Sequence, residues 1–402
     1  MSAKSDVPLV KFPSEEKSFT RAFLGFVKNY EAKLAFIDPE TNERLAFWDL
    51  ENIVNQMKFH LDKLEVSSGK IVATLCGNSI DFILMCLAVV DLGAAILPIN
   101  PASTVFEIEK YLLTCKVDHV IIETAYEEKM RKALARQEKF SKITVVNLKD
   151  LRGLREDEDI PKEKKEIELS GEETAFILFS SGTTGPPKAI CHSHRSMLAS
   201  LAQVIATTLT KSKFPFPSLL GDKMWHGVLP YFHAGGLVTV FVMLLEGVTL
   251  VINKKFTPAT FLRILTEHKI TFLSIVPTIL DFLNNHPAVD AYDLSALKRV
   301  FFLINNLYIF VGAASSKESQ LVALKKRLPN VEVLQMYGLT EAGLLIFMSP
   351  IGNTRLSSVG RPMPGVEAVV IGENKECLEC NEVGELALRS PSMMVGYYDH
   401  SE

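Results

Sequence analysis

The stretch SSGTTGPPK, residues 180–188, follows the apolar run FILF and combines hydroxyl side chains, glycines and a lysine. Glycine allows a backbone to approach an anion closely, and hydroxyl and N–H groups can then surround that anion. The ammonium group of Lys188 supplies a positive point charge. These residue types in this order indicate a loop that binds phosphate. The alternative is a surface turn of glycine and proline between two elements.

The glycine spacing in this stretch differs from that of a Walker A loop, which requires G-x-x-x-x-G-K followed by Ser or Thr. Gly182 and Gly185 are separated by two residues, and Lys188 is followed by Ala189. The spacing therefore argues against a P-loop nucleotide-binding protein.

Three later segments hold further residues that could take part in phosphate chemistry. In QMYGLTEAG, residues 335–343, an aromatic ring could stack on a base, and the Glu341 carboxylate could hold Mg²⁺ beside a phosphate. In VGAAS, residues 311–315, small side chains could let a planar ring lie on the backbone. In YFHAGG, residues 231–236, His233 stands among aromatics and glycines. Taken alone, each segment also fits ordinary structure, such as a helix cap or a packed histidine.

The elements that must position these residues follow from the hydrophobic pattern. Helices and strands alternate before the phosphate-binding stretch, which is typical of an α/β fold with a doubly wound parallel sheet. There the expected helices are 18–33, 46–64, 79–91 and 104–115, and the expected strands are 70–76, 94–98 and 117–122. A second round of alternation begins at residue 192, with strands 223–230, 248–252 and 270–275 and helices 258–268 and 277–286. Short strands at 368–371 and 384–389 predict a small β-subdomain.

The length and composition are those of a globular protein with more than one core. A chain of 402 residues suggests several subdomains. We expect a first α/β subdomain at about 1–190, a second at 191–354, and an incomplete β-subdomain at 355–402. The chain is 48% hydrophobic and 22% charged. Its net charge of −4 offers no basic surface for nucleic acid, so no nucleic-acid partner is expected.

Cysteine usage and the apolar runs bound the compartment. The 6 cysteines are scattered, form no disulfide framework and fit a reducing environment. Cys377 and Cys380 make a C-x-x-C, but no second pair follows, so we expect a polar hairpin rather than a zinc site. No apolar signal sequence opens the chain. The apolar runs 82–90 and 235–245 are too short to span a membrane, so no transmembrane segment is expected.

The order of the motifs resembles that of the adenylate-forming superfamily. In chain order they are SSGTTGPPK (180–188), FHAGG (232–236), GAAS (312–315), QMYGLTE (335–341), VGRPMPG (359–365) and GELALRSPSMMVGYY (384–398). The first and fourth are the most specific. Acyl-CoA synthetases, 4-coumarate–CoA ligases and luciferase-like proteins look most similar. The resemblance runs from about residue 20 to the end and implies the large N-terminal domain of that fold, with two doubly wound sheets, flanking helices and a small β-subdomain.

The resemblance implies an ATP-dependent ligase that joins a carboxylic acid to coenzyme A. The carboxylate attacks the α-phosphorus of ATP, which gives an acyl adenylate and pyrophosphate. A thiol, usually that of coenzyme A, then attacks the acyl carbon. Positioning and electrostatics carry both steps. The expected partners are ATP, Mg²⁺, coenzyme A and a hydrophobic fatty or aryl acid.

The resemblance also assigns roles to residues by position. The loop that cradles the β- and γ-phosphates corresponds to Ser180, Ser181, Gly182, Thr183, Thr184, Gly185 and Lys188. The nucleotide-binding segments correspond to Gly312, Ala313 and Ala314 against adenine, Tyr337 stacked on it, and Gly338 and Thr340, the last near the α-phosphate. The metal candidates are Glu341 and Thr184, and the catalytic candidates are Lys188, His233, Thr340 and Glu341. His233 matches a position near the acyl carboxylate, and a structural histidine is its alternative.

Two departures from the family pattern stand out. Family members continue beyond the last motif to a ribose-binding aspartate, a hinge and a C-terminal domain with a lysine that stabilises the adenylation transition state. None of these lies within the 402 residues, so the chain is expected to stop before that domain. In RVFFLINNLYIFVGAASS, residues 301–310 look like an insertion. It is either an extended strand or lineage-specific loop, or else a translated intron or mis-assembled gene model.

Two functions remain open at this point. The chain is either a ligase, with weak MgATP binding and poor adenylation in this form, or a non-catalytic protein that binds ATP or an acyl group. Cytoplasmic and peroxisomal locations both fit the cysteine usage, and the acyl substrate is not fixed by the sequence.

Overall fold

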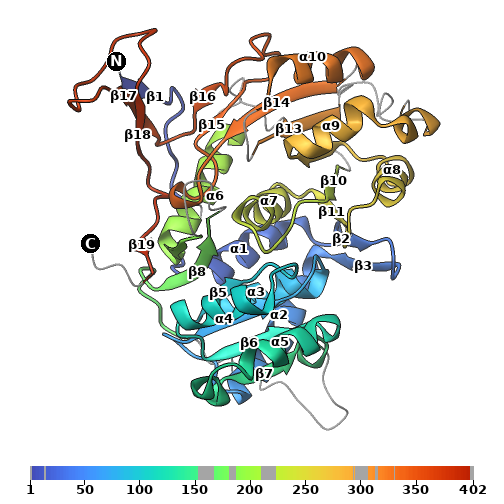
Figure 1. Ribbon diagram of the computed structural model, residues 1–402, viewed down its shortest axis with the longest axis vertical. Helices are drawn as coiled ribbons and strands as arrows, with labels where there is room; N and C mark the ends of the chain where they lie inside the picture. Colours follow the sequence, from blue (N-terminus) through green and yellow to red (C-terminus); the bar gives the residue numbers. More distant parts are fainter. Residues whose placement is uncertain are drawn as a thin grey trace.

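Two large β-sheets, with helices between them and on their outer faces, make up most of the chain (Figure 1). The computed structural model describes residues 2–12, 15–152, 167–180, 187–209, 223–292, 294, 307–312, 316–329 and 331–398.

In the first sheet the strands lie in the order β19-β9-β8-β5-β4-β6-β7. Neighbouring strands run parallel among β4 (Ile71–Leu75), β5 (Ala95–Pro98), β6 (His119–Ile122), β7 (Thr144–Asn147) and β8 (Thr174–Phe179). β9 (Ala189–Ser193) is antiparallel to β8, and β19 (Gly396–Tyr397) is antiparallel to β9. One edge of this sheet is therefore built by β9, which follows residues 180–188, and by β19 from far along the chain.

In the second sheet the order is β16-β15-β14-β13-β12-β10-β11-β2-β3. The parallel strands are β2 (Leu34–Asp38), β10 (Met224–Gly227), β11 (Thr249–Ile252), β12 (Phe272–Ile275), β13 (Leu307–Val311) and β14 (Val331–Tyr337). Antiparallel strands flank them: β3 (Glu43–Ala46) on one side, and β15 (Phe347–Met348) and β16 (Arg361–Pro362) on the other.

The helices divide into an inner layer and two outer layers. The central apolar cluster takes in α1 (Phe19–Val27), α2 (Phe47–Lys63), α3 (Ile80–Asp91), α6 (His194–Leu209) and α7 (Ala234–Leu245). The outer face of the first sheet packs on α4 (Val105–Thr114) and α5 (Glu127–Leu134). The outer face of the second sheet packs on α8 (Pro258–Glu267), α9 (Pro277–Asn285) and α10 (Glu318–Arg327).

The strand sequences explain this layering. Side chains alternate between the faces of a strand. In β4, Val72 belongs to the central cluster, whereas Ile71 and Ala73 belong to the outer one. In β12, Phe272 faces the centre and Leu273 faces the outer helices. Strands buried on both faces read as continuous apolar runs, as parallel sheets require.

Aromatic side chains join the inner helices to the first sheet. The ring of Phe19 in α1 lies 5.2 Å from Phe176 in β8 and 5.1 Å from Phe241 in α7, edge to face in both pairs. Such pairs add about 0.5–1.5 kcal/mol beyond the area that they bury. They fix α1 and α7 relative to the strand that leads into the phosphate-binding stretch.

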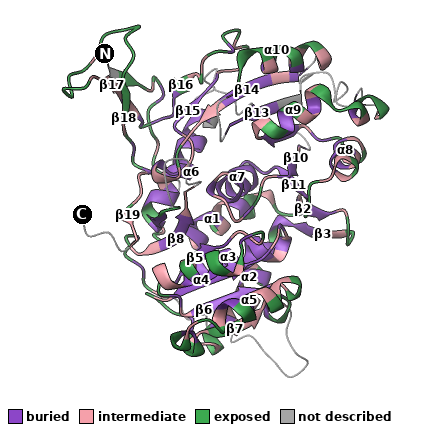
Figure 2. Cartoon of the chain, viewed as in Figure 1, coloured by how far each residue is buried: buried purple, intermediate pink, exposed green. Residues whose placement is uncertain are grey.

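A small sheet of β1 (Ser2–Lys4), β17 (Glu367–Ile371) and β18 (Glu385–Arg389) stands apart from the large ones. Figure 2 shows much of the segment around β17 and β18 exposed, in contrast to the buried strands of the large sheets. Cys377 and Cys380 are exposed in the segment between these strands. Among the described residues, no group of three or more His, Cys, Asp or Glu side chains could hold a metal ion.

Short 3₁₀ helices complete the connections. They are η1 (Lys28–Tyr30), η2 (Thr124–Tyr126), η3 (Glu138–Lys142), η4 (Leu148–Leu151), η5 (Pro287–Ala291) and η7 (Thr340–Ala342). Within the described ranges, no helix is long and apolar enough to cross a membrane.

The predicted α/β class with two doubly wound sheets is confirmed. The sheets exchange strands, however: β2 and β3 join the second sheet, and β19 joins the first. The subdomain boundaries near 190 and 354 stay a prediction. Of the expected insertion at 301–310, Leu307 to Phe310 lie in β13, paired in register with β12 and β14. This pairing favours the extended-strand interpretation for those four residues, and 301–306 lie outside the described residues.

Acid is expected to destabilise the fold through His226. This residue lies in β10 with its ring 4.9 Å from that of Phe261. Burial, and to a smaller extent the nearby His268, lowers the pKa of His226 to about 3. An unfolded histidine takes up a proton below about pH 6.5, whereas the native one stays neutral. The contribution of the neutral His226 to the unfolding free energy is therefore complete above about pH 6.5. It is lost as the pH falls toward the pKa of His226 in the folded state.

We expect His226→Leu to remove this loss. Between about pH 7.5 and about pH 5, the unaltered chain is expected to lose about 2 kcal/mol more unfolding free energy than the variant. Urea denaturation at the two pH values measures the difference. His286→Leu, which removes an exposed histidine, is the control. An identical pH dependence in His226→Leu and the unaltered chain would contradict the assignment.

Candidate active site

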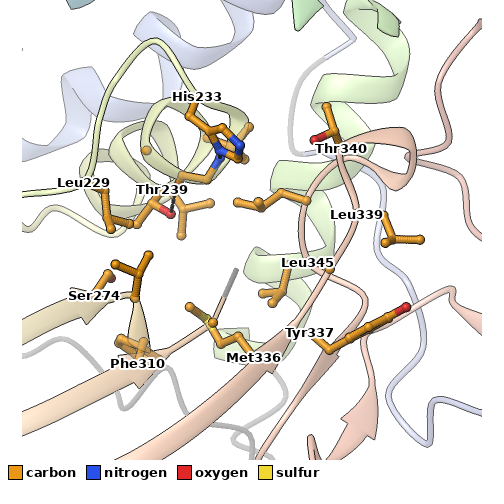
Figure 3. Close-up of a pocket in the computed structure, with 18 of the residues that line it drawn as sticks. Leu229, His233, Thr239, Ser274, Phe310, Met336, Tyr337, Leu339, Thr340 and Leu345 are labelled. Carbon is orange, nitrogen blue, oxygen red and sulfur yellow. Dashed lines mark hydrogen bonds between the residues drawn. The ribbon is translucent and has the colours of Figure 1, made fainter. Parts of the chain in front are cut away.

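A pocket of about 1110 Å³ lies between the two large sheets, and Figure 3 shows some of its lining. From the second sheet it is lined by residues at the carboxyl ends of β12, β13 and β14. From the first sheet it is lined by Ser180, Lys188 and Tyr397. Helices α6 and α7 supply its inner wall. In open α/β sheets, ligands bind in the crevice outside the carboxyl ends of the strands, and the pocket occupies such a position.

Strand register explains why distant segments meet here. Ile275 pairs with Val311, and Val311 pairs with Gln335, so three parallel strands end at nearly the same level. The residues that follow, including Val276 and Gly312, therefore line one edge.

The two ends of the phosphate-binding stretch are joined by hydrogen bonds. The Ser180 N–H donates to the Lys188 carbonyl at 3.0 Å, and the Lys188 N–H donates to Ser180 Oγ at 3.1 Å. Both residues line the pocket, and their contact with phosphate stays a prediction. The other predicted loop residues lie outside the described residues; they are Ser181, Gly182, Thr183, Thr184 and Gly185.

The turn after β14 brings Thr340 and Glu341 to the same pocket. Gly338 admits no side chain there, because a Cβ would lie 1.3 Å from the Leu344 carbonyl oxygen. Gly343 has φ +73°, a conformation that glycine adopts readily. The close approach of the Leu344 backbone therefore explains why residue 338 is a glycine.

The carbonyl oxygens of this turn are held from outside it. Their donors are His192 Nε2 to Thr340 at 2.7 Å, Met394 N–H to Glu341 at 2.7 Å, Ser392 Oγ to Ala342 at 2.8 Å, and Ser200 Oγ to Gly343 at 2.6 Å. The donors come from β9, from the segment before β19 and from α6. The turn is therefore fixed by its backbone rather than by the Thr340 and Glu341 side chains, which line the pocket.

His192 is a functional residue that the sequence analysis missed. It is 1% exposed, and burial lowers its pKa against the opposing effect of the bond to Thr340. A neutral ring that donates from Nε2 accepts at Nδ1, where Ser196 Oγ lies at 3.3 Å. The residue lies four positions after Lys188. A histidine in this stretch gives no sign in the sequence that it contacts Thr340, which is 148 positions away.

Tyr397 is a second residue to which the sequence analysis gave no role, although its motif was noted. Its hydroxyl donates to Glu341 Oε1 at 3.3 Å. The Lys188 ammonium lies 4.8 Å from the centre of its ring. Burial first, and then Glu341, raises the pKa of the Tyr397 phenol, so the phenol stays protonated and can donate.

Gly312 and Tyr337, both predicted to contact adenine, line the pocket. A Cβ at Gly312 would lie 3.1 Å from the Met336 carbonyl oxygen, so only glycine fits without a shift. Figure 3 shows the Tyr337 ring on the side of the pocket away from Leu229 and Ser274. Ala313 and Ala314 lie outside the described residues.

His233 caps the N-terminus of α7, where its Nδ1 accepts from the Gly235 N–H at 3.1 Å. Burial lowers its pKa, so the ring is neutral at physiological pH. Figure 3 places His233 at the edge of the pocket across from Thr340. The cap satisfies one ring nitrogen and supports the structural alternative, while the position on the pocket is compatible with the predicted ligand contact.

Besides polar residues such as Gln203, Thr239 and Ser274, the remaining wall has a large apolar part. It includes Val238, Val242 and Met243 of α7, Phe310 of β13, Met336 of β14, and Leu345. The pocket thus joins a polar side, with a cation and a carboxylate, to an apolar chamber. Together these could hold an amphipathic ligand or two ligands of opposite character.

The donor set fits Mg²⁺ rather than a softer metal. Glu341 and Thr340 offer oxygen ligands on the polar side, and Thr184 lies outside the described residues. Mg²⁺ is usually held by one or two carboxylates together with phosphates and waters. A single carboxylate beside a phosphate-binding loop matches that pattern.

We expect His192→Leu to loosen the turn. The Thr340 carbonyl would lose its 2.7 Å donor and keep only the longer bond from the Gly343 N–H at 3.4 Å, so we expect a loss of about 0.5–1.5 kcal/mol of unfolding free energy. His192→Gln, whose amide can donate, is expected to lose less. Denaturant titration at about pH 7.5 measures both, with the exposed Ser67→Ala as control. Equal stability of the leucine and glutamine variants would count against the bond.

Comparison with known proteins agrees with this architecture. The family model described as AMP-binding enzyme matches residues 24–398. A probable CoA ligase of Humulus lupulus is 30% identical over 385 residues, which cover 93% of the chain and 67% of that protein. The 4-coumarate–CoA ligase 3 of Arabidopsis thaliana is 26% identical over 412 residues, covering 99% and 70%.

Solved structures agree on the fold. The inhibitor-bound N-terminal domain of FACL13 from Mycobacterium tuberculosis has a TM-score of 0.81 at 23% identity, covering 96% of this chain and 92% of that one. At this identity the likeness shows the fold alone. The family match extends over nearly the whole length, and the chain therefore belongs to the family of AMP-binding enzymes.

Proposed function

We propose that the chain binds ATP and a hydrophobic carboxylic acid, forms an acyl adenylate, and passes the acyl group to coenzyme A. One observation carries the proposal: Lys188, Thr340, Glu341 and His233, which lie far apart in the sequence, line a single pocket beside an apolar chamber. An acid and a nucleotide would meet where the polar and apolar sides join. Membership in the AMP-binding family and the similarity to CoA ligases support this reading.

The side chains suit the bond changes of the first step. A carboxylate oxygen forms a bond to the α-phosphorus, and the bond to the bridging oxygen of pyrophosphate breaks. The Lys188 ammonium would balance charge on the phosphates, and the Thr340 hydroxyl would donate to the α-phosphate. Mg²⁺ held by Glu341 would neutralise phosphate charge. His233, neutral and fixed by its cap, would lie near the acid carboxylate. Preorganised groups of this kind lower the barrier without reorganising during the reaction.

The second step needs a thiol to attack the acyl carbon and AMP to leave. The chamber formed by α7, β13 and β14 would exclude water from the adenylate during that interval. Its aliphatic and aromatic side chains favour a fatty or aryl acid over a small polar one.

The direct test is pyrophosphate release by the purified chain with MgATP and a panel of fatty and aryl acids. Acid-dependent release supports the proposal and identifies the acid class. Binding of ATP without release for any acid would contradict catalysis and point to a binding protein. Calorimetry with ATP separates that outcome from a failure to bind.

We expect Lys188→Ala to lower acid-dependent pyrophosphate release about 100-fold, because one preorganised charge that faces the phosphates is lost. Lys132→Ala is the matched control, since Lys132 is exposed on α5 and pairs only with Glu128 in the same helix. A Lys188→Ala rate within about twofold of the unaltered chain would exclude the proposed phosphate contact.

We expect Val242→Trp to shift the acid preference. Val242 is 7% exposed and lines the apolar chamber from α7, so an indole there would shorten the space for the acid. Activity with long acids is expected to fall about tenfold or more, while that with short acids is retained, since added bulk in a packed site costs about 1–3 kcal/mol. Parallel kcat/KM measurements over acids of increasing length test this. Equal losses for all lengths would show a general folding effect instead.

A further inference from the structure

Tyr397 lies between the two opposite charges of the pocket. The Lys188 ammonium sits 4.8 Å from its ring centre, within the range of a cation–π contact. Its hydroxyl donates to Glu341 Oε1 at 3.3 Å. Among the described residues, the lysine and the glutamate are bridged through this tyrosine rather than paired directly. One side chain thus contacts both the predicted phosphate-binding cation and the predicted metal ligand.

The backbone holds this tyrosine in place from two directions. β19 pairs with β9 so that Tyr397 stands opposite Ile190, two residues beyond Lys188. The Val395 N–H donates to the Cys191 carbonyl at 2.8 Å, which extends the contact with β9. The Met394 N–H donates to the Glu341 carbonyl at 2.7 Å. The segment is therefore anchored both to the strand that begins just after Lys188 and to the turn that carries Glu341.

We propose that Tyr397 is a positioning residue for MgATP: its hydroxyl orients the Glu341 carboxylate for the metal ion, and its ring holds the Lys188 ammonium toward the phosphates. The inference rests on the proposed function. A direct Lys188–Glu341 ion pair would consume both charges, and MgATP would have to break it before binding. The tyrosine keeps the charges apart and leaves Glu341 Oε2 free of this hydrogen bond.

The two contacts can be removed separately. Tyr397→Phe keeps the ring under Lys188 and removes only the hydroxyl. It is expected to weaken ATP binding in the presence of Mg²⁺ about tenfold, because a hydrogen bond to a charged group is lost. ATP binding without Mg²⁺ is expected to stay within about twofold. Tyr397→Leu also removes the ring, and it is expected to weaken Mg²⁺-free binding about threefold.

The experiment is isothermal calorimetry of the 402-residue chain with ATP, once with Mg²⁺ and once with a chelator. The variants are Tyr397→Phe, Tyr397→Leu, Glu341→Gln and the double variant Tyr397→Phe/Glu341→Gln. In the double variant the tyrosine change is expected to add less than twofold, because the carboxylate on which it acts is gone. Tyr126→Phe is the matched control, since Tyr126 lies near Glu123 outside the pocket. The thermal unfolding midpoint of each variant checks that it folds.

Each outcome decides the inference. A loss confined to Mg²⁺-dependent binding in Tyr397→Phe, and absent from the Glu341→Gln background, supports it. Unchanged or tighter MgATP binding in Tyr397→Phe would overturn it, and tighter binding would mark the tyrosine as an obstacle. An equal loss in both backgrounds would show an effect that bypasses Glu341 and would also overturn it. If the unaltered chain binds no ATP, the proposed function fails and this inference falls with it.

Discussion

The hydrogen bond from His192 to the Thr340 carbonyl joins the two parts of the fold that carry the predicted nucleotide-binding residues. It ties β9, the strand that begins after Lys188, to the turn that follows β14 in the other sheet. Ser200, Ser392 and Met394 hold the next carbonyls of the same turn. Because the backbone of the turn is fixed from β9, from α6 and from the segment before β19, the spacing between the sheets at the pocket is set there. The apolar layers determine how the sheets pack, whereas these bonds fix the backbone at Glu341.

The same bonds explain the mixed polarity of the pocket. On one side, neighbouring donors hold the backbone carbonyls of the turn, and the Thr340 and Glu341 side chains line the pocket. On the other side, α7 is almost entirely buried and presents aliphatic side chains to the chamber. A charged group in that chamber would lose hydration without gaining partners. An acid with an apolar body would therefore enter with its carboxylate toward the polar side, where a nucleotide phosphate would be held.

The sequence alone revealed the parallel strands and the loops at their ends, because buried strands read as apolar runs and the loops carry unusual residue types. Lys188, Tyr337 and Glu341 were found in this way, and all line the pocket. The sequence did not reveal that β9 reverses direction or that β2 and β3 cross into the second sheet, since pairing depends on distant segments. His192 and Tyr397 escaped for the same reason: their partners lie 148 and 56 positions away, and neither residue type is unusual in its own segment.

The backbone of the turn that carries Glu341 is strained at Leu344. Leu344 has φ +93°, a conformation that costs a residue with a side chain about 1–3 kcal/mol. The chain adopts it where the Leu344 carbonyl passes over Gly338, so close that no Cβ fits. The Leu344 side chain lines the pocket near Gly235 of α7. The carbonyl bonds from Ser200 and Ser392 immediately before it, each worth about 0.5–1.5 kcal/mol, offset the strain. Bonds from α6 and from the segment before β19 thus hold the turn in a conformation that the local sequence disfavours.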